Sequence, residues 1–229
     1  TKDMAIAYDT WWNTRNRKSY VFNPSNPNIK PKIISDRNYQ DTYSDPGSFL
    51  RSRNEFNRSV LKMHYGNIFL RGQGFSPSGQ FPFIDKVNTK TFEKTRVYQS
   101  SYTDKIESII DYDPKKNQLT VSIESPSEYP NYYTKKVKSG KLEKLTNLKN
   151  PFLELQNVKK EKITYLRNDG VELSGILYLP LNYDKEKKEK MPMILWAYPR
   201  EFKDRQSASQ NTKNSNEFTY PYYCLLYTS

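Results

Sequence analysis

The sequence predicts a mostly β protein, and its composition and its regularly spaced polar turns support this fold class. Among the 229 residues there are 19 tyrosines, 11 phenylalanines and 3 tryptophans, but only four alanines. Alanine is the best helix former, whereas aromatic and β-branched residues favour strands, so a helical bundle is excluded. Disordered chains are poor in aromatic residues, so an aromatic content of 14% also excludes wholesale disorder.

Three segments share one build, in which strand-like runs are joined by short polar turns. They cover residues 10–35, 67–98 and 109–146, and their last turns are centred near residues 25, 89 and 139. The spacing between these turns, about 64 and 50 residues, is typical of four-stranded propeller blades with loop insertions. Because a propeller needs about four or more blades, three such units do not close a ring.

The pattern changes after Pro151. An alternating run over residues 162–167 is followed by Asn168-Asp169-Gly170 and a second run over residues 171–180. An Asp-Gly pair between two alternating runs predicts a β-hairpin. Residues 192–197 then form a continuous apolar run, which predicts a central strand covered on both faces. This strand is expected to end at Tyr198.

The segment from Lys162 to Phe202 resembles the start of the catalytic α/β-hydrolase domain in the prolyl oligopeptidase family. That family places a β-propeller ahead of the hydrolase domain. Three further stretches resemble its glutamyl endopeptidase branch, namely residues 43–48, residues 75–85 and residues 196–203. The resemblance implies the C-terminal blades of a propeller over residues 1–157 and the first strands of the peptidase domain over residues 158–223. Residues 224–229 do not resemble the family and are predicted to be a non-native tail.

The resemblance implies a serine peptidase that hydrolyses peptide bonds, after glutamate in this branch, through a Ser-His-Asp triad. The family's nucleophile lies in a Gly-x-Ser-x-Gly turn, and the sequence contains none. The nearest approach, Gly74-Phe75-Ser76-Pro77-Ser78, lacks the second glycine, and Gly72, Gly74 and Gly79 are interpreted as turn glycines. We therefore expect the triad beyond residue 229 and no activity in residues 1–229 alone.

One candidate site residue is Tyr198. In relatives of this family, a tyrosine after the equivalent strand stabilises the oxyanion, and Tyr198 resembles it by position. The alternative is a packing tyrosine at the end of a strand. Arg200 departs from the glycine expected in this branch, which leaves the geometry of the loop open.

The net charge of +12 admits several partners. An enzyme that cleaves after glutamate needs cations near an acidic peptide substrate, but an ordinary basic surface accounts for the charge as well. Binding of nucleic acid is disfavoured, because the basic runs are short (residues 15–18 and 135–136) and the densest charged run mixes both signs. A propeller-type binding module without catalytic activity is the remaining alternative. No apolar run reaches the roughly 18 residues of a membrane span.

The chain has one cysteine, Cys224, and one histidine, His64. A single cysteine excludes an intrachain disulfide and a cysteine-based zinc site, and no cofactor is expected. His64 precedes a strand-like stretch and is interpreted as a structural or surface residue. The sequence leaves the cellular compartment open.

Overall fold

A computed structural model describes residues 3–155, 157–187, 190–198, 200–213 and 216–218, and these residues are mostly β-strand. The first sheet contains β1 (Ala5–Trp11), β2 (Asn16–Phe22) and β3 (Lys32–Asn38). The second contains β4 (Ser48–Phe49), β8 (Asn67–Gly72), β11 (Phe83–Asn88) and β12 (Lys94–Gln99). The third contains β13 (Ile106–Asp113), β14 (Gln118–Glu124), β15 (Asn131–Lys136) and β16 (Leu142–Lys144). The remaining elements are β5 (Arg51–Arg53), β6 (Ser59–Leu61), β7 (Met63–His64), β9 (Phe75–Ser76), β10 (Gly79–Gln80), η1 (Leu153–Leu155), β17 (Lys159–Leu166), β18 (Glu172–Leu179) and α1 (Arg205–Ala208).

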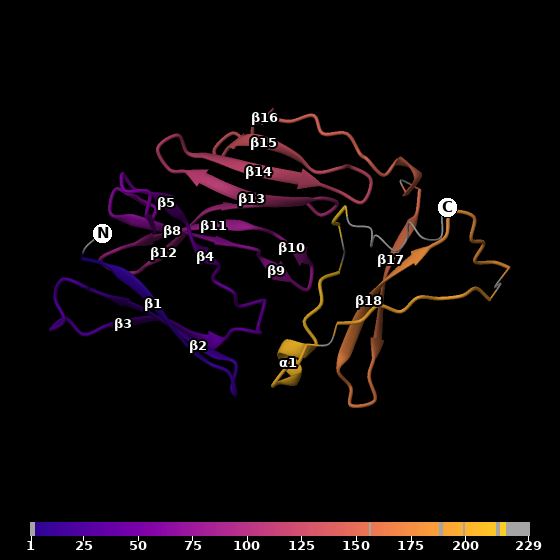
Figure 1. The fold of residues 1–229 in the computed structure, drawn as a ribbon, viewed down its shortest axis with the longest axis horizontal. Helices are drawn as coiled ribbons and strands as arrows, with labels where there is room; N and C mark the ends of the chain where they lie inside the picture. The colour runs from indigo at the N-terminus through magenta and orange to yellow at the C-terminus, as the bar shows by residue number, and fades with distance from the viewer. Residues whose placement is uncertain (1–2, 156, 188–189, 199, 214–215, 219–229) are drawn as a thin grey trace.

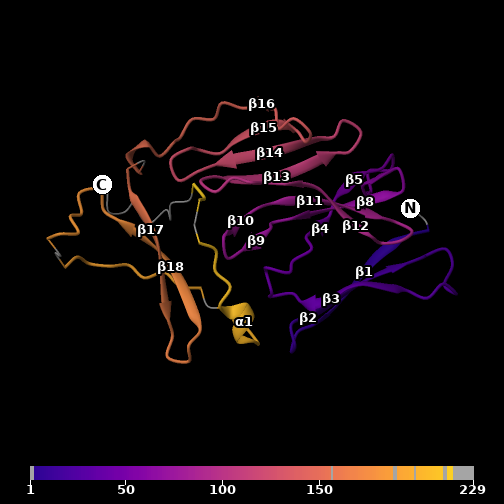
Figure 2. The same ribbon diagram turned by 180° about the vertical axis from the view of Figure 1, so that it is seen from behind.

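The three predicted units each form an antiparallel sheet (Figures 1 and 2). The orders are β1-β2-β3, β12-β11-β8-β4 and β13-β14-β15-β16, and β7 pairs with β8 at the side of the second sheet. The predicted turns lie between β2 and β3, between β11 and β12, and between β15 and β16, so these three hairpins are confirmed.

The three units differ in detail. Only the third is a plain four-stranded meander, whereas the first has three strands and the second draws β4 from a distant part of the chain. No sheet in the described ranges closes on itself. The mostly β class is confirmed, while the assignment of these sheets to a propeller stays a prediction.

The sheet that contains β8 and β11 forms the middle layer, and both of its faces are buried. On one face, Phe69 and Ile84 pack against Ile109, Leu119 and Val121 of the β13–β16 sheet. On the other face, Ile68, Leu70 and Val87 pack together with the partly buried Met4, Phe49, Leu61 and Phe92. Burial on both faces explains why the apolar residues of β8 are continuous rather than alternating.

A buried polar cluster joins the same two sheets beside the apolar core. The Lys135 ammonium donates to Glu107 Oε1 at 2.7 Å and to the Tyr98 hydroxyl at 2.6 Å, and that hydroxyl donates to Glu107 Oε2. Glu107 is fully buried, and Lys135 is 8% exposed. Burial, followed by the hydrogen bond to the Glu107 carboxylate, raises the pKa of Tyr98 well above its ordinary value. The cluster therefore contains a neutral tyrosine and one compensated pair of charges.

Two of the three glycines near the incomplete serine motif have the backbone expected of turn glycines. Gly74 and Gly79 have φ angles of +63° and +152°, which side chains rarely adopt. Gly72 instead lies within β8, where an added Cβ would lie 2.1 Å from the Phe83 ring. The interpretation of Gly72 as a turn residue is wrong, because its role is to admit a neighbouring aromatic ring.

The hairpin predicted around Asp169-Gly170 is confirmed by the pairing of β17 with β18 over eight residue pairs. Gly170 has a φ angle of +76°, and its amide donates to the Arg167 carbonyl at 2.7 Å. The Arg167 guanidinium donates twice to the Asp169 carboxylate and lowers the pKa of Asp169 to about 2. The turn is thus stabilised by its own side chains.

The central strand predicted over residues 192–197 is wrong, since residues 190–198 contain no strand. Met193, Leu195 and Trp196 are each more than 70% exposed. A strand needs a neighbouring strand to accept and donate its backbone hydrogen bonds, and β17 and β18 pair only with each other in the described part of the chain. Without a neighbouring strand in the described residues, the apolar run does not form a β-strand.

The remaining domain predictions are not decided by these elements. The boundary between residues 157 and 158 stays a prediction, and the predicted tail with Cys224 lies outside the described residues. Within those residues, no helix has the length and apolar character needed to cross a membrane.

The first prediction concerns Gly74, whose added Cβ would lie 1.9 Å from the Phe81 carbonyl oxygen. Gly74→Ala should cost more than 2 kcal/mol locally, because a backbone clash adds to the roughly 1 kcal/mol of a positive φ angle. Gly140→Ala is the matched control, since Gly140 has a φ angle of +68° and no atom within 4 Å of an added Cβ. Hydrogen exchange of peptides that cover β9 and β10, and of those that cover β15 and β16, measures both effects. Equal destabilisation by the two variants would contradict the prediction.

The second prediction concerns the buried ion pair. Lys135→Met should lower the free energy of unfolding by about 3–5 kcal/mol, because it leaves the Glu107 carboxylate buried and uncompensated. Lys141→Met should cost less than about 1 kcal/mol, since the Lys141–Glu143 pair is exposed. Glu107→Leu combined with Lys135→Met should cost less than Lys135→Met alone. Denaturant unfolding checks this order, and a Lys135→Met cost as small as that of Lys141→Met would refute it.

Candidate functional site

Tyr198, the candidate oxyanion residue, lies at the end of residues 190–198, which contain no strand, and is 86% exposed. Its hydroxyl makes no hydrogen bond to any residue that the structure describes. Stabilisation of an oxyanion requires a donor aimed at a reacting carbonyl in a site that excludes water. The described residues do not enclose Tyr198 in this way, so its catalytic role stays a prediction.

The chain after Tyr198 runs between the first sheet and the β17–β18 hairpin, as both views show (Figures 1 and 2). We call residues 200–213 and 216–218 the bridging segment. Its first contact with the first sheet is made by Glu201, whose carboxylate accepts a hydrogen bond from Arg15 Nη2 at 3.0 Å. The Glu201 carbonyl also accepts from Gln40 Nε2 at 2.6 Å. The hydrogen bond from the Lys203 ammonium, and then the charge of Arg15, lower the pKa of Glu201 below its ordinary value.

The short helix α1 continues the contact with the first sheet. Asp204 caps this helix by accepting from the Ser207 amide at 2.7 Å, and its carboxylate also accepts from Asn38 Nδ2 at 2.6 Å. On the opposite side, the Arg205 guanidinium donates to the Gly170 carbonyl at 2.6 Å. One helical turn is therefore bonded both to the first sheet and to the turn of the β17–β18 hairpin.

Gln210 provides a further connection to the loop after β3. Its Oε1 accepts from the amide and the hydroxyl of Thr42, and its Nε2 donates to the Asp41 carboxylate. Burial by itself raises the pKa of Asp41, but the hydrogen bonds from Ser44 and Gln210 outweigh it and hold that pKa below its ordinary value. The Tyr43 hydroxyl donates to the Asn211 carbonyl at 2.6 Å.

Two lysines of β17 hold the far end of the bridging segment. Lys160 Nζ donates to the Glu217 carbonyl at 2.6 Å, and Lys162 Nζ donates to the Thr212 carbonyl. Burial lowers the pKa of both lysines. The first sheet and the loop after β3 thus hold the segment mostly through contacts between side chains, whereas the two lysines of the hairpin bond to its backbone carbonyls.

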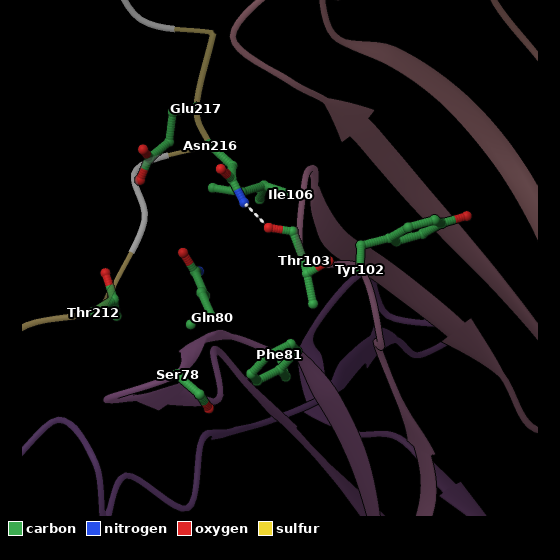
Figure 3. Close-up of a pocket in the computed structure, with 10 residues that line it drawn as sticks. Ser78, Gln80, Phe81, Tyr102, Thr103, Ile106, Thr212, Asn216 and Glu217 are labelled. Carbon is green, nitrogen blue, oxygen red and sulfur yellow. Dashed lines mark hydrogen bonds between the residues drawn. The ribbon is translucent and has the colours of Figure 1, made fainter. Parts of the chain in front are cut away.

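A small polar pocket lies where the bridging segment passes the β9–β10 hairpin and the start of β13 (Figure 3). Asn216 Nδ2 donates to the Thr103 carbonyl at 2.9 Å, and Gln80 and Glu217 also line the pocket. Its volume of about 20 Å³ admits about one water molecule and excludes a peptide.

A larger open groove of about 470 Å³ runs along the β15–β16 edge of the third sheet. Three lysines line it, Lys105, Lys144 and Lys149, together with tyrosines such as Tyr129 and Tyr133. Lys105 is paired with Glu128 at 2.6 Å, and this hydrogen bond raises the pKa of Lys105. The size suits a small ligand, but part of the positive charge is already neutralised.

No serine–histidine pair is formed in the described ranges. The ring of His64 packs on the Tyr65 ring at a centroid distance of 4.1 Å, in agreement with a structural role. Ser76 of the incomplete motif lies in β9, and its hydroxyl bonds to Ser78 Oγ and to the Gly79 carbonyl. The described residues likewise form no cluster of histidine, cysteine and carboxylate side chains that could hold a metal ion.

Sequence reasoning missed the contacts of the bridging segment with the first sheet. Arg15 and Gln40 are separated from Glu201 by more than 150 residues, and no local pattern pairs them. The one available signal was the short basic run at residues 15–18, which reads as surface charge. In the structure the first residue of this run, Arg15, is buried, and only 2% of its side chain is exposed.

Comparison with known proteins relates the chain to peptidases. It is 33% identical over 230 residues to a probable chloroplastic glutamyl endopeptidase of Arabidopsis thaliana and 32% identical over 231 residues to one of Oryza sativa subsp. japonica. These matches cover 94% and 95% of the chain, but only 24% and 25% of the relatives. The chain therefore spans about a quarter of the length of the curated relatives that it matches.

Comparisons with protein-family models and with solved structures give weaker evidence on function. No protein-family model matches the chain. A solved structure of the AtxE2 isopeptidase is 13% identical with a TM-score of 0.42 and covers 80% of this chain and 25% of its own. The similarity to proteins named as glutamyl endopeptidases extends over nearly the whole chain and supports a peptidase-related function.

Proposed function

We propose that this chain is part of a serine-type peptidase of the prolyl oligopeptidase family, in its glutamyl endopeptidase branch. The observation that carries the proposal is the 33% identity to a probable glutamyl endopeptidase over 94% of the chain. The mostly β fold and the hairpin that precedes the apolar run are in keeping with it. Because the chain spans a quarter of that relative, the activity belongs to the whole protein.

In the proposed reaction, histidine takes the proton of a serine hydroxyl, and the serine attacks a peptide carbonyl. The C–N bond then breaks, histidine gives the proton to the leaving amine, and water hydrolyses the resulting acyl-enzyme. His64 is the only histidine of the sequence, and its ring lies against the Tyr65 ring at an angle of 51°. The proposal therefore assigns the triad to residues outside 1–229. The substrate is a peptide cleaved after glutamate, which a chain with a net charge of +12 would attract.

The proposed contribution of residues 1–229 to catalysis is the Tyr198 hydroxyl. It would donate a hydrogen bond to the oxygen that becomes negative in the tetrahedral intermediate. A donor in that position lowers the barrier by roughly 3–4 kcal/mol. The described residues leave Tyr198 86% exposed, so the proposal requires the rest of the protein or the substrate to exclude water from it.

The third prediction tests the class of enzyme. The full-length protein should react with a fluorophosphonate probe, because such probes modify only an activated serine nucleophile. Digestion and mass spectrometry should place the modified serine outside residues 1–229. The heat-denatured protein is the control and should not react. Absence of labelling in the native protein would overturn the serine-peptidase proposal, and a modified serine within residues 1–229 would overturn the location of the triad.

The fourth prediction tests Tyr198. In the full-length protein, Tyr198→Phe should lower kcat by about 100- to 1000-fold on a peptide with a single glutamate, with KM little changed, because only the transition state gains the hydrogen bond. Tyr165→Phe is the matched control, since Tyr165 is an exposed tyrosine of β17. Steady-state kinetics and the melting temperature are measured for both variants. An unchanged kcat in Tyr198→Phe would refute the role.

A further inference from the structure

We infer that Arg15 is a positioning residue for the proposed reaction, which acts by holding the chain next to Tyr198 through Glu201. The inference rests on the proposed function, because it assigns Arg15 a role in the same site. It concerns a residue of the first sheet, more than 180 positions from Tyr198 in the sequence.

Arg15 is built into the turn between β1 and β2. Its backbone has a φ angle of +57°, which is unfavourable for a residue with a side chain, and its carbonyl accepts from the Tyr39 amide at 2.8 Å. The guanidinium lies 3.9 Å from the centroid of the Trp12 ring, and Nη1 donates to the Trp12 carbonyl at 2.9 Å. Cation–π contact and burial hold the group in one place.

The buried guanidinium has one carboxylate partner within the described residues, which is Glu201. Burial of a cation is costly unless a charge compensates it, so the contact with Glu201 is favoured despite the exposure of the glutamate. Gln40 holds the backbone of the same residue through its carbonyl. Glu201 is thus fixed by its side chain and by its main chain, from two loops of the first sheet.

Glu201 is close enough to restrict Tyr198. Three steps of about 3.8 Å separate their Cα atoms along the chain, so the two lie within about 11 Å. The contact at Glu201 is also the first hydrogen bond or ion pair that the structure describes after Tyr198. Loss of the Arg15 contact therefore weakens the first described attachment of the chain after Tyr198.

Catalysis is sensitive to such freedom, because a misplacement of about 1 Å costs about 100-fold in rate. A donor that acts only in the transition state affects kcat when its position is lost, whereas a purely structural arginine affects stability. Arg15 and Tyr198 should consequently behave as one unit in a double-mutant cycle.

The fifth prediction is tested in the full-length enzyme with a peptide that contains one glutamate. Arg15→Met should lower kcat by about 10-fold and change KM by less than about 2-fold. Arg15→Lys should restore part of kcat, because it keeps the charge but not the planar donor group. Arg53→Met is the matched control, since Arg53 lies on an exposed strand and its guanidinium donates to the neighbouring Asn57 carbonyl, and kcat of this variant should not change.

The double variant separates positioning from structure. In a Tyr198→Phe background, Arg15→Met should cause less than a 2-fold further loss of kcat. A full additional 10-fold loss, or an unchanged kcat in the single variant, would overturn the inference. If Arg15→Met does not fold, Glu201→Ala removes the exposed partner and should give the same loss of kcat and the same dependence on Tyr198.

Hydrogen exchange distinguishes failure of the anchor from failure of the proposed function. Arg15→Met should accelerate exchange in peptides that cover residues 200–204, and unchanged exchange there would overturn the anchor itself. A wild-type enzyme that neither hydrolyses peptides nor reacts with fluorophosphonate overturns the proposed function, and the positioning role fails with it. If the wild-type enzyme is active and kcat of Arg15→Met is unchanged, only the positioning role is overturned.

Discussion

The buried contact between Glu107 and Lys135 is the interaction on which the arrangement of the sheets depends most. It connects β13 and β15 within one sheet, and Tyr98 extends it to β12 of the neighbouring sheet. An apolar interface alone tolerates many orientations, whereas a buried pair of charges is satisfied in only one. The core around Ile84, Leu119 and Val121 supplies the stabilisation, and the cluster favours a single register between the sheets.

The bridging segment is stabilised in a different way. Few of its side chains are buried, and its contacts include hydrogen bonds from Arg15, Gln40, Asn38 and two lysines of β17. Individual hydrogen bonds of this kind contribute only about 0.5–1.5 kcal/mol each. A segment held by many weak bonds keeps its path while single contacts can open, which suits a connection between sheets that also borders a proposed catalytic residue.

The relation to peptidases does not depend on any catalytic motif in the chain. The similarity covers nearly all of it, although the sequence has no nucleophile elbow and its only histidine packs against a tyrosine ring. By the proposal, the chain contributes structural support to the reaction and one donor at Tyr198. This division is physically reasonable, because catalytic groups must be held by rigid surroundings that take no part in the chemistry.

The sequence by itself determined the local structure. Composition predicted the mostly β class, and turn residues placed the hairpins, because an Asp-Gly pair or the Asp113 carboxylate that accepts from the Lys115 and Lys116 amides acts within a few residues. Only the tertiary structure decided which charges are buried. Arg15 and Lys135 belong to short basic runs that read as surface, yet each meets a carboxylate brought in from elsewhere in the chain. The predicted strand over residues 192–197 is wrong for the same reason. A buried strand forms only where neighbouring strands pair with it, and a local sequence pattern does not supply those neighbours.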